Sequence, residues 1–344
     1  MSEFLKDHTT LRVGGPAREF VVASTEADLI AATRTDQPLL ILSGGSNLVV
    51  SDSGFDGRVV KVATKGIVAD VDHPDDIGCL GATSVKVAAG ESWDDLVATA
   101  GRNGWVGIEA LSGIPGLAGA TPIQNVGAYG QEVASTIAQV RTWDRLNQTQ
   151  RTFAAAECGF GYRTSRFKAD PQRYLILEVT FLFKQGTLSA PIAYSELAQR
   201  LGVELGERAP LVDVRRAVLD LRASKGMVLD DSDHDTWSAG SFFTNPVIAP
   251  ERVPEGAPAW PQPDGTVKTS AAWLIDHAGF SRGYPEGGSV TLSTKHPLAI
   301  TNRGGANAAD VLELARVVRA GVADRFGIEL VNEPVFVGLD LLQA

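Results

Sequence analysis

Two glycine-rich segments have the residue types and spacing that could bind a phosphate group. The first, SGGSNL at residues 43–48, directly follows a short aliphatic run, Leu39–Leu42. The second, IPGLAGATPIQNVGAYG, occupies residues 114–130. Glycine leaves backbone N–H groups accessible, and these donate to phosphate oxygens without any basic side chain. We therefore expect both segments to hold a diphosphate ligand, with tight turns that bind nothing as the alternative.

Both common phosphate-binding motifs are missing from these segments. A P-loop requires GxxxxGK[ST], and neither segment contains a lysine. The dinucleotide fingerprint is GxGxxG, whereas Gly113, Gly116 and Gly119 are spaced GxxGxxG. A dinucleotide would therefore be held by a different fold.

Composition excludes several classes of function. The chain has 344 residues and a net charge of −10, so no overall field attracts nucleic acid or an anionic membrane. Its two cysteines, Cys79 and Cys158, form no CxxC motif, and no two histidines are spaced i, i+4. We expect no disulfide framework, no metal site and a reducing compartment. The sequence shows no apolar run of roughly 18–20 residues and no signal-peptide core, which predicts a cytoplasmic protein without membrane insertion.

Short strands and two capped helices are expected to position the glycine-rich segments. Strands are predicted at residues 19–23, 39–42, 59–62, 85–88, 137–143 and 175–183. Thr25 and Ser92 each precede an acid three residues later and an apolar run, which predicts two helix N-termini. The second of these helices should end near Gly101–Gly104.

Helical patterns dominate the second half of the chain, and a domain boundary is predicted after Lys184. Helices are predicted at residues 212–221, at 271–278 after a cap at Thr269 or Ser270, and from Asn307 to Gly327. Residues 230–235 and 251–265 read as loops. The predicted fold class is α+β in two domains, 1–184 and 185–344.

Six motifs in fixed order then resemble one family. They are GGSNLVV, IPGLAGATPIQNVGAYG, CGFGYRTSRFK, GSFFTNP, LSTKHPLAI and NEPVFVG, and they span about residues 8–340. The chain resembles the UDP-N-acetylenolpyruvoylglucosamine reductase (MurB) family, in the subgroup with a tyrosine-bearing substrate loop. The resemblance implies an FAD-binding domain of the vanillyl-alcohol-oxidase (PCMH) type, in two subdomains over 1–184, and a C-terminal α+β substrate-binding domain over 185–344.

The resemblance also implies an activity. NADPH, as co-substrate, would reduce non-covalently bound FAD, and N5 of the reduced flavin would give hydride to the enolpyruvyl group of UDP-N-acetylglucosamine enolpyruvate. The product would be UDP-N-acetylmuramate, a peptidoglycan precursor needed for cell-wall biogenesis, cell shape and cell division. The expected partners are the UDP-sugar and NADPH, and the expected state is a monomer.

The family motifs carry over residue by residue. Arg163, Ser241 and Glu333 match catalytic positions. Substrate-binding positions match Tyr162, Tyr194, Lys225, Asn245 and His296. Cofactor-binding positions match Ser43, Gly44, Gly45, Ser46, Asn47, Leu48, Ile114, Pro115, Gly116, Gly119, Ala120, Thr121, Gln124, Asn125, Gly127, Tyr129 and Arg222. Thr244 departs from the family pattern, which often has a basic residue there.

The chemistry explains why such residue types are needed. Hydride addition at the β-carbon leaves carbanion character at the α-carbon, which delocalises into the neighbouring carboxylate. The always-charged fork of Arg163 suits that carboxylate, while Glu333 could hold Arg163 or, if protonated, donate to the carboxylate. Ser241 would protonate the α-carbon, and Lys225 would polarise that hydroxyl or bind the diphosphate.

Two other readings stay open. A sugar or alcohol oxidase of the same fold often holds FAD covalently through His or Cys, and neither glycine-rich segment contains one. A UDP-sugar-binding protein without activity would be expected to have lost a catalytic residue, and all three are present. Taken alone, Arg163 could be a surface ion pair, Ser241 a cap, and Glu333 or His296 solvated, while Cys158, Phe242 and Phe243 read as core.

Overall fold

The structure, a computed structural model, describes residues 3–71 and 82–341. Cys79 lies outside the described residues. Two compact units divide the chain. We call Phe20–Gly44 with Arg58–Ala223 the large unit, and Met1–Glu19 with Gly45–Gly57 and Ser224–Ala344 the C-terminal unit.

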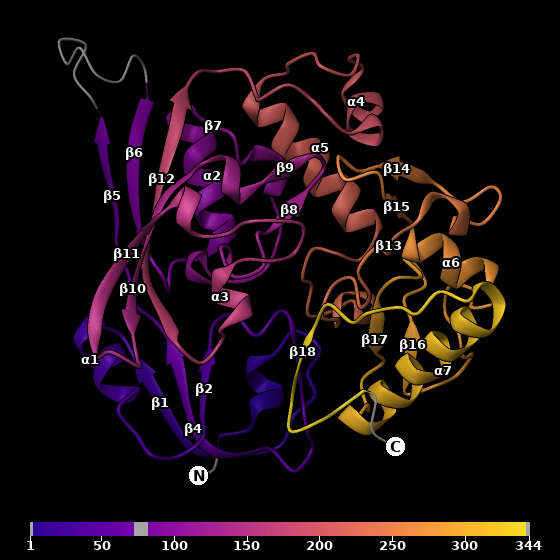
Figure 1. Ribbon diagram of the computed structural model, residues 1–344, viewed down its shortest axis with the longest axis horizontal. Helices are drawn as coiled ribbons and strands as arrows, with labels where there is room; N and C mark the ends of the chain where they lie inside the picture. The colour runs from indigo at the N-terminus through magenta and orange to yellow at the C-terminus, as the bar shows by residue number, and fades with distance from the viewer. Residues whose placement is uncertain (1–2, 72–81, 342–344) are drawn as a thin grey trace. The chain divides into compact units, whose positions relative to one another are not determined.

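The principal sheet of the large unit is antiparallel, in the order β11-β10-β12-β6-β5 (Figure 1). Its strands are β5 (Ile67–Val71), β6 (Ala82–Ala88), β10 (Ile137–Asp144), β11 (Thr149–Ala154) and β12 (Tyr174–Gln185). The short β7 (Trp105–Val106) pairs with the end of β12. A three-stranded sheet has the order β1-β4-β2, from β1 (Ala17–Ala23), β2 (Leu39–Leu42) and β4 (Phe55–Val62). All six predicted strands are confirmed.

The two predicted helix N-termini are confirmed as well. Helix α1 (Glu26–Ala32) begins after Thr25, whose side chain accepts from the Asp28 N–H. Helix α2 (Trp93–Asn103) begins after Ser92, which accepts from the Asp95 N–H, and ends at Gly104 in the left-handed conformation (φ +70°). Only glycine adopts that conformation without strain, so it stops the helix where the sequence indicates.

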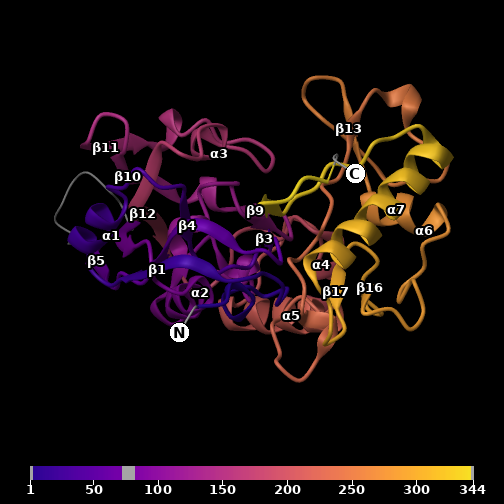
Figure 2. The same cartoon turned by 90° about the horizontal axis from the view of Figure 1, so that it is seen from below.

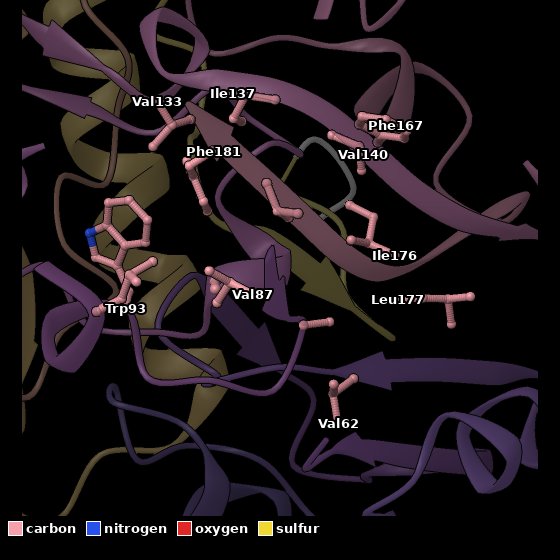
Figure 3. Close-up of a cluster of buried hydrophobic side chains, with 14 of the residues drawn as sticks. Val62, Val87, Trp93, Val133, Ile137, Val140, Phe167, Ile176, Leu177 and Phe181 are labelled. Carbon is pink, nitrogen blue, oxygen red and sulfur yellow. The ribbon is translucent and has the colours of Figure 1, made fainter. Parts of the chain in front are cut away.

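The core of the large unit is built from the inner faces of the sheets and helix α2 (Figure 3). Trp93, Val87 and Phe181 are fully buried within it. Alternation along β12 places Leu175, Leu177, Val179, Phe181 and Phe183 in the interior, as predicted. Cys158 is also buried, and burial raises its thiol pKa to about 11, which fits a structural rather than a nucleophilic role.

The glycine-rich and tyrosine-bearing parts of the large unit lie on shorter elements. These are η2 (Glu109–Leu111), η3 (Ala118–Ala120), β8 (Gly127–Ala128), β9 (Gln131–Glu132), η4 (Val133–Ser135), η5 (Ala155–Glu157), α3 (Arg166–Ala169), α4 (Ser195–Leu201) and α5 (Leu211–Ser224). Ile192, Leu197 and Val214 form an apolar cluster with Ala110, so residues after 184 pack with the large unit. The predicted boundary after Lys184 divides the chain by ligand rather than by packing, and it stays a prediction.

The C-terminal unit packs two helices on short strands. Helix α7 (Ala308–Phe326) lies beside α6 (Ala271–His277), β16 (Val290–Leu292) and β17 (Ile300–Asn302) (Figure 2). Ser270, not Thr269, caps α6, and Gly279 follows its end at φ +97°. Asn307 caps α7 and left-handed Gly327 ends it, as predicted. Strand β3 (Leu48–Val50) pairs in parallel with β18 (Val335–Val337).

Two predicted loops contain regular structure. Residues 251–265 include β14 (Ala259–Pro261), which pairs with β15 (Val267–Thr269), itself paired with β13 (Val247–Ile248). Residues 230–235 run into η6 (His234–Thr236), in which Asp235 is buried. The remaining short elements are η1 (Leu5–His8) and η7 (Pro250–Arg252). All three residues of β14 are exposed, so it lacks the alternation that reveals a strand in sequence.

Candidate functional site

The two glycine-rich segments meet backbone to backbone within the large unit. A Cβ built on Gly44 would lie 2.6 Å from Cα of Gly116, and one on Gly119 would lie 2.5 Å from Cβ of Ala89. The second segment is fastened by hydrogen bonds from Trp93 N–H to Gly116 O (3.1 Å) and from Gly119 N–H to Ala89 O (2.9 Å). Glycine is therefore required at these positions for close packing, which accounts for part of the glycine density.

Ser43, at the start of the first segment, has a buried hydroxyl. Its Oγ has no hydrogen-bond partner among the described residues. Native proteins rarely bury a polar atom without a partner, so such a group indicates an absent ligand or water. The hydroxyl and the glycine backbone next to it fit the diphosphate of a dinucleotide such as FAD.

Arg163 is anchored to the backbone of the second segment. Its Nη2 donates to Gly127 O (2.8 Å) and its Nη1 to Asn125 O (3.5 Å). Asn125 is 1 % exposed, and its side chain donates to Glu132 Oε2 (2.8 Å) and accepts from Ala134 N–H (3.1 Å). The structure thus brings Arg163 together with Asn125 and Gly127, which were predicted separately as catalytic and cofactor-binding residues.

Left-handed backbone marks the same region. Five non-glycine residues of the described chain have positive φ, and three of them are predicted site residues: Asn125 (+47°), Tyr129 (+49°) and Arg163 (+52°). A non-glycine residue in this conformation stores about 1–3 kcal/mol of strain and persists only where its surroundings impose it. Such strain is concentrated at functional sites, which supports the assignment of this region.

Tyr129 and Tyr194 form an edge-to-face pair. Their ring centroids are 5.3 Å apart and the planes are inclined by 88°. Burial raises the pKa of Tyr129 to about 12, although the nearby Arg222 opposes this shift. Burial also lowers the pKa of Arg222, against the opposing charges of Tyr129 and Asp94. A cation desolvated to this extent is suited to binding a phosphate.

Asp94 and Arg215 form an ion pair in the same unit that the sequence did not reveal. Arg215 binds the carboxylate with both terminal nitrogens, at 2.7 and 2.8 Å, and Gly113 N–H donates to it at 2.6 Å. Burial raises the pKa of Asp94, but these hydrogen bonds outweigh it, and the net effect is a lowered pKa. The two residues are far apart in sequence and belong to no motif, so no sequence signal could have paired them.

Ser241 and Glu333 belong to neighbouring backbone segments of the C-terminal unit. Glu333 N–H donates to the carbonyl of Phe242 (2.9 Å), and Asn47 Nδ2 donates to the carbonyl of Glu333 (3.3 Å). Phe242 is fully buried, as predicted, and fixes the strand-like segment to the core. Ser241 itself is partly exposed. Asn47, predicted to bind the cofactor, therefore also holds the backbone of a predicted catalytic residue.

The remaining predicted substrate residues are placed less informatively. Asn245 Oδ1 accepts from Ala271 N–H (3.0 Å) at the first turn of α6, which is a structural contact. His296 lies in the turn after β16, where its N–H donates to Ser293 Oγ (3.3 Å). Lys225 follows α5 and is partly buried, and Tyr162 is 37 % exposed.

The part of the chain that the structure describes shows no group of three or more His, Cys, Asp or Glu side chains arranged to bind a metal ion. Among its helices, none has both the length and the apolar character needed to cross a membrane.

Comparisons with known proteins bear on the whole chain. Residues 17–152 match an FAD-binding domain family, and residues 231–337 match the C-terminal domain family of UDP-N-acetylenolpyruvoylglucosamine reductase. The chain is 59 % identical to the UDP-N-acetylenolpyruvoylglucosamine reductase of Cutibacterium acnes, covering 96 % of this chain and 88 % of that protein. It is 53 % identical to the enzyme of that name from Streptomyces avermitilis, covering 97 % and 93 %.

A solved structure agrees with the sequence comparisons. The crystal structure of the Thermus caldophilus UDP-N-acetylenolpyruvylglucosamine reductase (MurB) matches 98 % of each chain, with a TM-score of 0.66 and 28 % identity. The predicted α+β fold with an FAD-binding domain and a distinct C-terminal domain is confirmed. This chain, an FAD-binding oxidoreductase, therefore belongs to the UDP-N-acetylenolpyruvoylglucosamine reductase family.

Proposed function

We propose that the protein reduces the enolpyruvyl group of UDP-N-acetylglucosamine enolpyruvate to give UDP-N-acetylmuramate, with NADPH as the reductant. The observation that carries the proposal is the similarity to reductases over nearly the whole chain. Retention of Arg163, Ser241 and Glu333 within their motifs adds to it. This places the protein in peptidoglycan precursor synthesis.

The cofactor in this proposal is non-covalent FAD. The Ser43–Gly44 segment, the backbone around Gly116 and the buried Arg222 would hold its phosphates. When bound, FAD supplies the transfer of hydride from NADPH to the enol carbon of the sugar nucleotide. All other steps fall to side chains of this chain.

Arg163 is proposed to stabilise the charge that develops on the substrate carboxylate. Its hydrogen bonds to Gly127 O and Asn125 O support this role, because they fix the guanidinium plane before substrate arrives. A preorganised cation costs no reorganisation when charge develops, which is the main source of electrostatic catalysis. Lysine could not replace it, because an ammonium group lacks the planar fork that matches a carboxylate.

Ser241 is proposed to protonate the α-carbon. A serine hydroxyl is a weak acid, but the carbanionic intermediate is a strong base, so a positioned hydroxyl suffices. Glu333 is proposed to stabilise the same intermediate, and Lys225 to polarise the hydroxyl or bind the diphosphate. The backbone bond between Glu333 and Phe242, next to Ser241, supports a joint role.

A monomeric state and a cytoplasmic location belong to the same proposal. A chain with two cysteines and no CxxC motif fits a reducing compartment. The UDP-sugar and NADPH are the proposed partners.

The test is a product assay with the purified protein. NADPH and the enolpyruvyl UDP-sugar should be consumed in equal amounts, and mass spectrometry should find a sugar nucleotide that has gained two hydrogen atoms. NADPH consumption that ignores the sugar but follows oxygen would favour an oxidase instead. Binding of the sugar without any consumption would favour the inactive binding protein.

A further inference from the structure

The carboxylate of Glu109 is buried and binds three N–H donors. Glu109, on η2, is 3 % exposed. Its Oε1 accepts from Ala190 N–H (2.7 Å) and from Gln131 Nε2 (2.8 Å), and its Oε2 accepts from Gly107 N–H (2.7 Å). An ionised carboxylate accepts only, so three short bonds from donors suit it well.

The donors come from three separate segments of the large unit. Gln131 begins β9, immediately after the Tyr129–Gly130 turn. Its side-chain oxygen also accepts from Ala110 N–H (2.8 Å), so both ends of its amide are held by η2. Ala190 lies four residues before Tyr194. The carboxylate therefore ties the hairpin that carries Tyr129 to the segment that carries Tyr194.

Packing next to the two tyrosines depends on the same two segments. A Cβ on Gly130 would lie 2.8 Å from Cβ of Ala193, so the turn and the segment are in close contact. Tyr129 also packs on the buried cluster that contains Ala110 and Ile192. Above this base, the two rings meet edge to face at 5.3 Å.

We propose that Glu109 is a positioning residue that sets the geometry of the Tyr129–Tyr194 pair and thereby the affinity for the sugar nucleotide. The second part rests on the proposed function, in which Tyr194 contacts the UDP-sugar. Glu109 touches neither ligand in this account, and it acts only through the two segments that it joins.

The test compares Glu109→Gln with Asp144→Asn. In the first variant, one acceptor oxygen becomes an NH₂ group that must face an N–H donor, so one bond of the three is replaced by repulsion. Asp144 is a matched control, because it is also a buried carboxylate of the large unit with backbone and side-chain donors. It lies at the β10–β11 turn.

We expect Glu109→Gln to raise the KM for the UDP-sugar by about tenfold or more. The kcat at saturating sugar should stay within about twofold of the wild type, because uniform binding is what is lost. Asp144→Asn should lose stability and keep its KM. An unchanged KM in Glu109→Gln, or an equal rise in Asp144→Asn, would overturn the inference.

A double-mutant cycle tests the route. If Glu109 acts through Tyr194, Glu109→Gln should add little to the KM of Tyr194→Ala, whereas independent effects would multiply. Multiplied effects would contradict a route through this tyrosine.

Amide hydrogen exchange on the FAD-containing protein gives a readout that needs no turnover. Glu109→Gln should speed exchange at Gly107 and at Ala190, and in peptides covering 127–131 and 190–194, while Asp144→Asn should not. Unchanged protection there would overturn the positioning role. Faster exchange in a protein that does not reduce the sugar would support the positioning role and contradict the proposed function instead.

Discussion

At the scale of single residues, the candidate site is defined by anchored backbone as much as by reactive side chains. Arg163, Asn125 and Tyr129 all adopt left-handed backbone, and the first two are joined by a hydrogen bond. The family motifs named these residues, but their strain and mutual contacts are visible only in the structure.

Replacing the proposed proton donor should separate the two halves of the reaction. Ser241→Ala is expected to slow substrate reduction by about 10²–10⁴-fold, since general acid catalysis typically contributes that much. Flavin reduction by NADPH should be preserved, because no proton reaches the sugar in that step. Stopped-flow absorbance measures both rates, and Ser238→Ala in the same unit is the control. Equal loss in both half-reactions would argue against a role as proton donor.

At the scale of elements, glycine contacts and buried carboxylates hold the site segments in place. Gly44 and Gly116 bring two distant loops into backbone contact, and Asp94, Glu109 and Asp144 each tie several segments together. Helix caps and strand alternation are local and could be predicted, as Thr25, Ser92 and Asn307 show. The carboxylate contacts are not local, and no pattern in the sequence indicates their partners.

The close approach of the glycine-rich segments can be tested with a single methyl group. Gly44→Ala should push the segments apart at Gly116, with a cost on the order of 1–3 kcal/mol in stability and a weaker affinity for FAD. Gly101→Ala is the control, because nothing lies within 4 Å of its Cβ in helix α2, and it should gain about 0.5–1 kcal/mol. FAD titration and thermal unfolding measure both effects. Tight FAD binding by Gly44→Ala would contradict the assigned cradle.

Acid stability should depend on the β10–β11 turn. Hydrogen bonds from Arg173 hold the pKa of Asp144 at about 2, below its ordinary 3.8, against the opposing effect of burial. A lowered folded-state pKa stabilises the protein above the ordinary value, and this stabilisation is lost as pH falls through about 2. The difference in unfolding free energy between wild type and Asp144→Asn should therefore be constant above pH 4 and shrink from there towards pH 2. A difference that stays constant over this range would contradict the pKa shift.

At the scale of the whole molecule, the chain passes repeatedly between its two compact units. Strand β3, directly after the first glycine-rich segment, pairs with β18 near the C-terminus, so the units are not consecutive in sequence. The predicted boundary at 184 could not anticipate this, because composition shifts reveal linkers but not long-range strand pairing. Arg163 lies in the large unit, while Ser241 and Glu333 lie in the C-terminal unit.

Removal of the cofactor should destabilise the folded chain. A ligand that binds only the folded state at about 100 times its Kd adds about 2.7 kcal/mol. Protein stripped of FAD should therefore unfold at a lower temperature, and added FAD should restore the midpoint. Differential scanning calorimetry measures the shift, with Gly44→Ala as a variant expected to show less of it. An FAD-independent midpoint would contradict the proposed FAD-binding role of the large unit.

The most direct test of the proposed reductase is an anaerobic titration followed by flavin absorbance. NADPH should bleach the flavin bands of the purified protein, and they should return when the enolpyruvyl UDP-sugar is added. This result is predicted because the proposal assigns both half-reactions to one bound flavin. Bands that return with oxygen but not with the sugar, or a protein that binds no FAD, would contradict it.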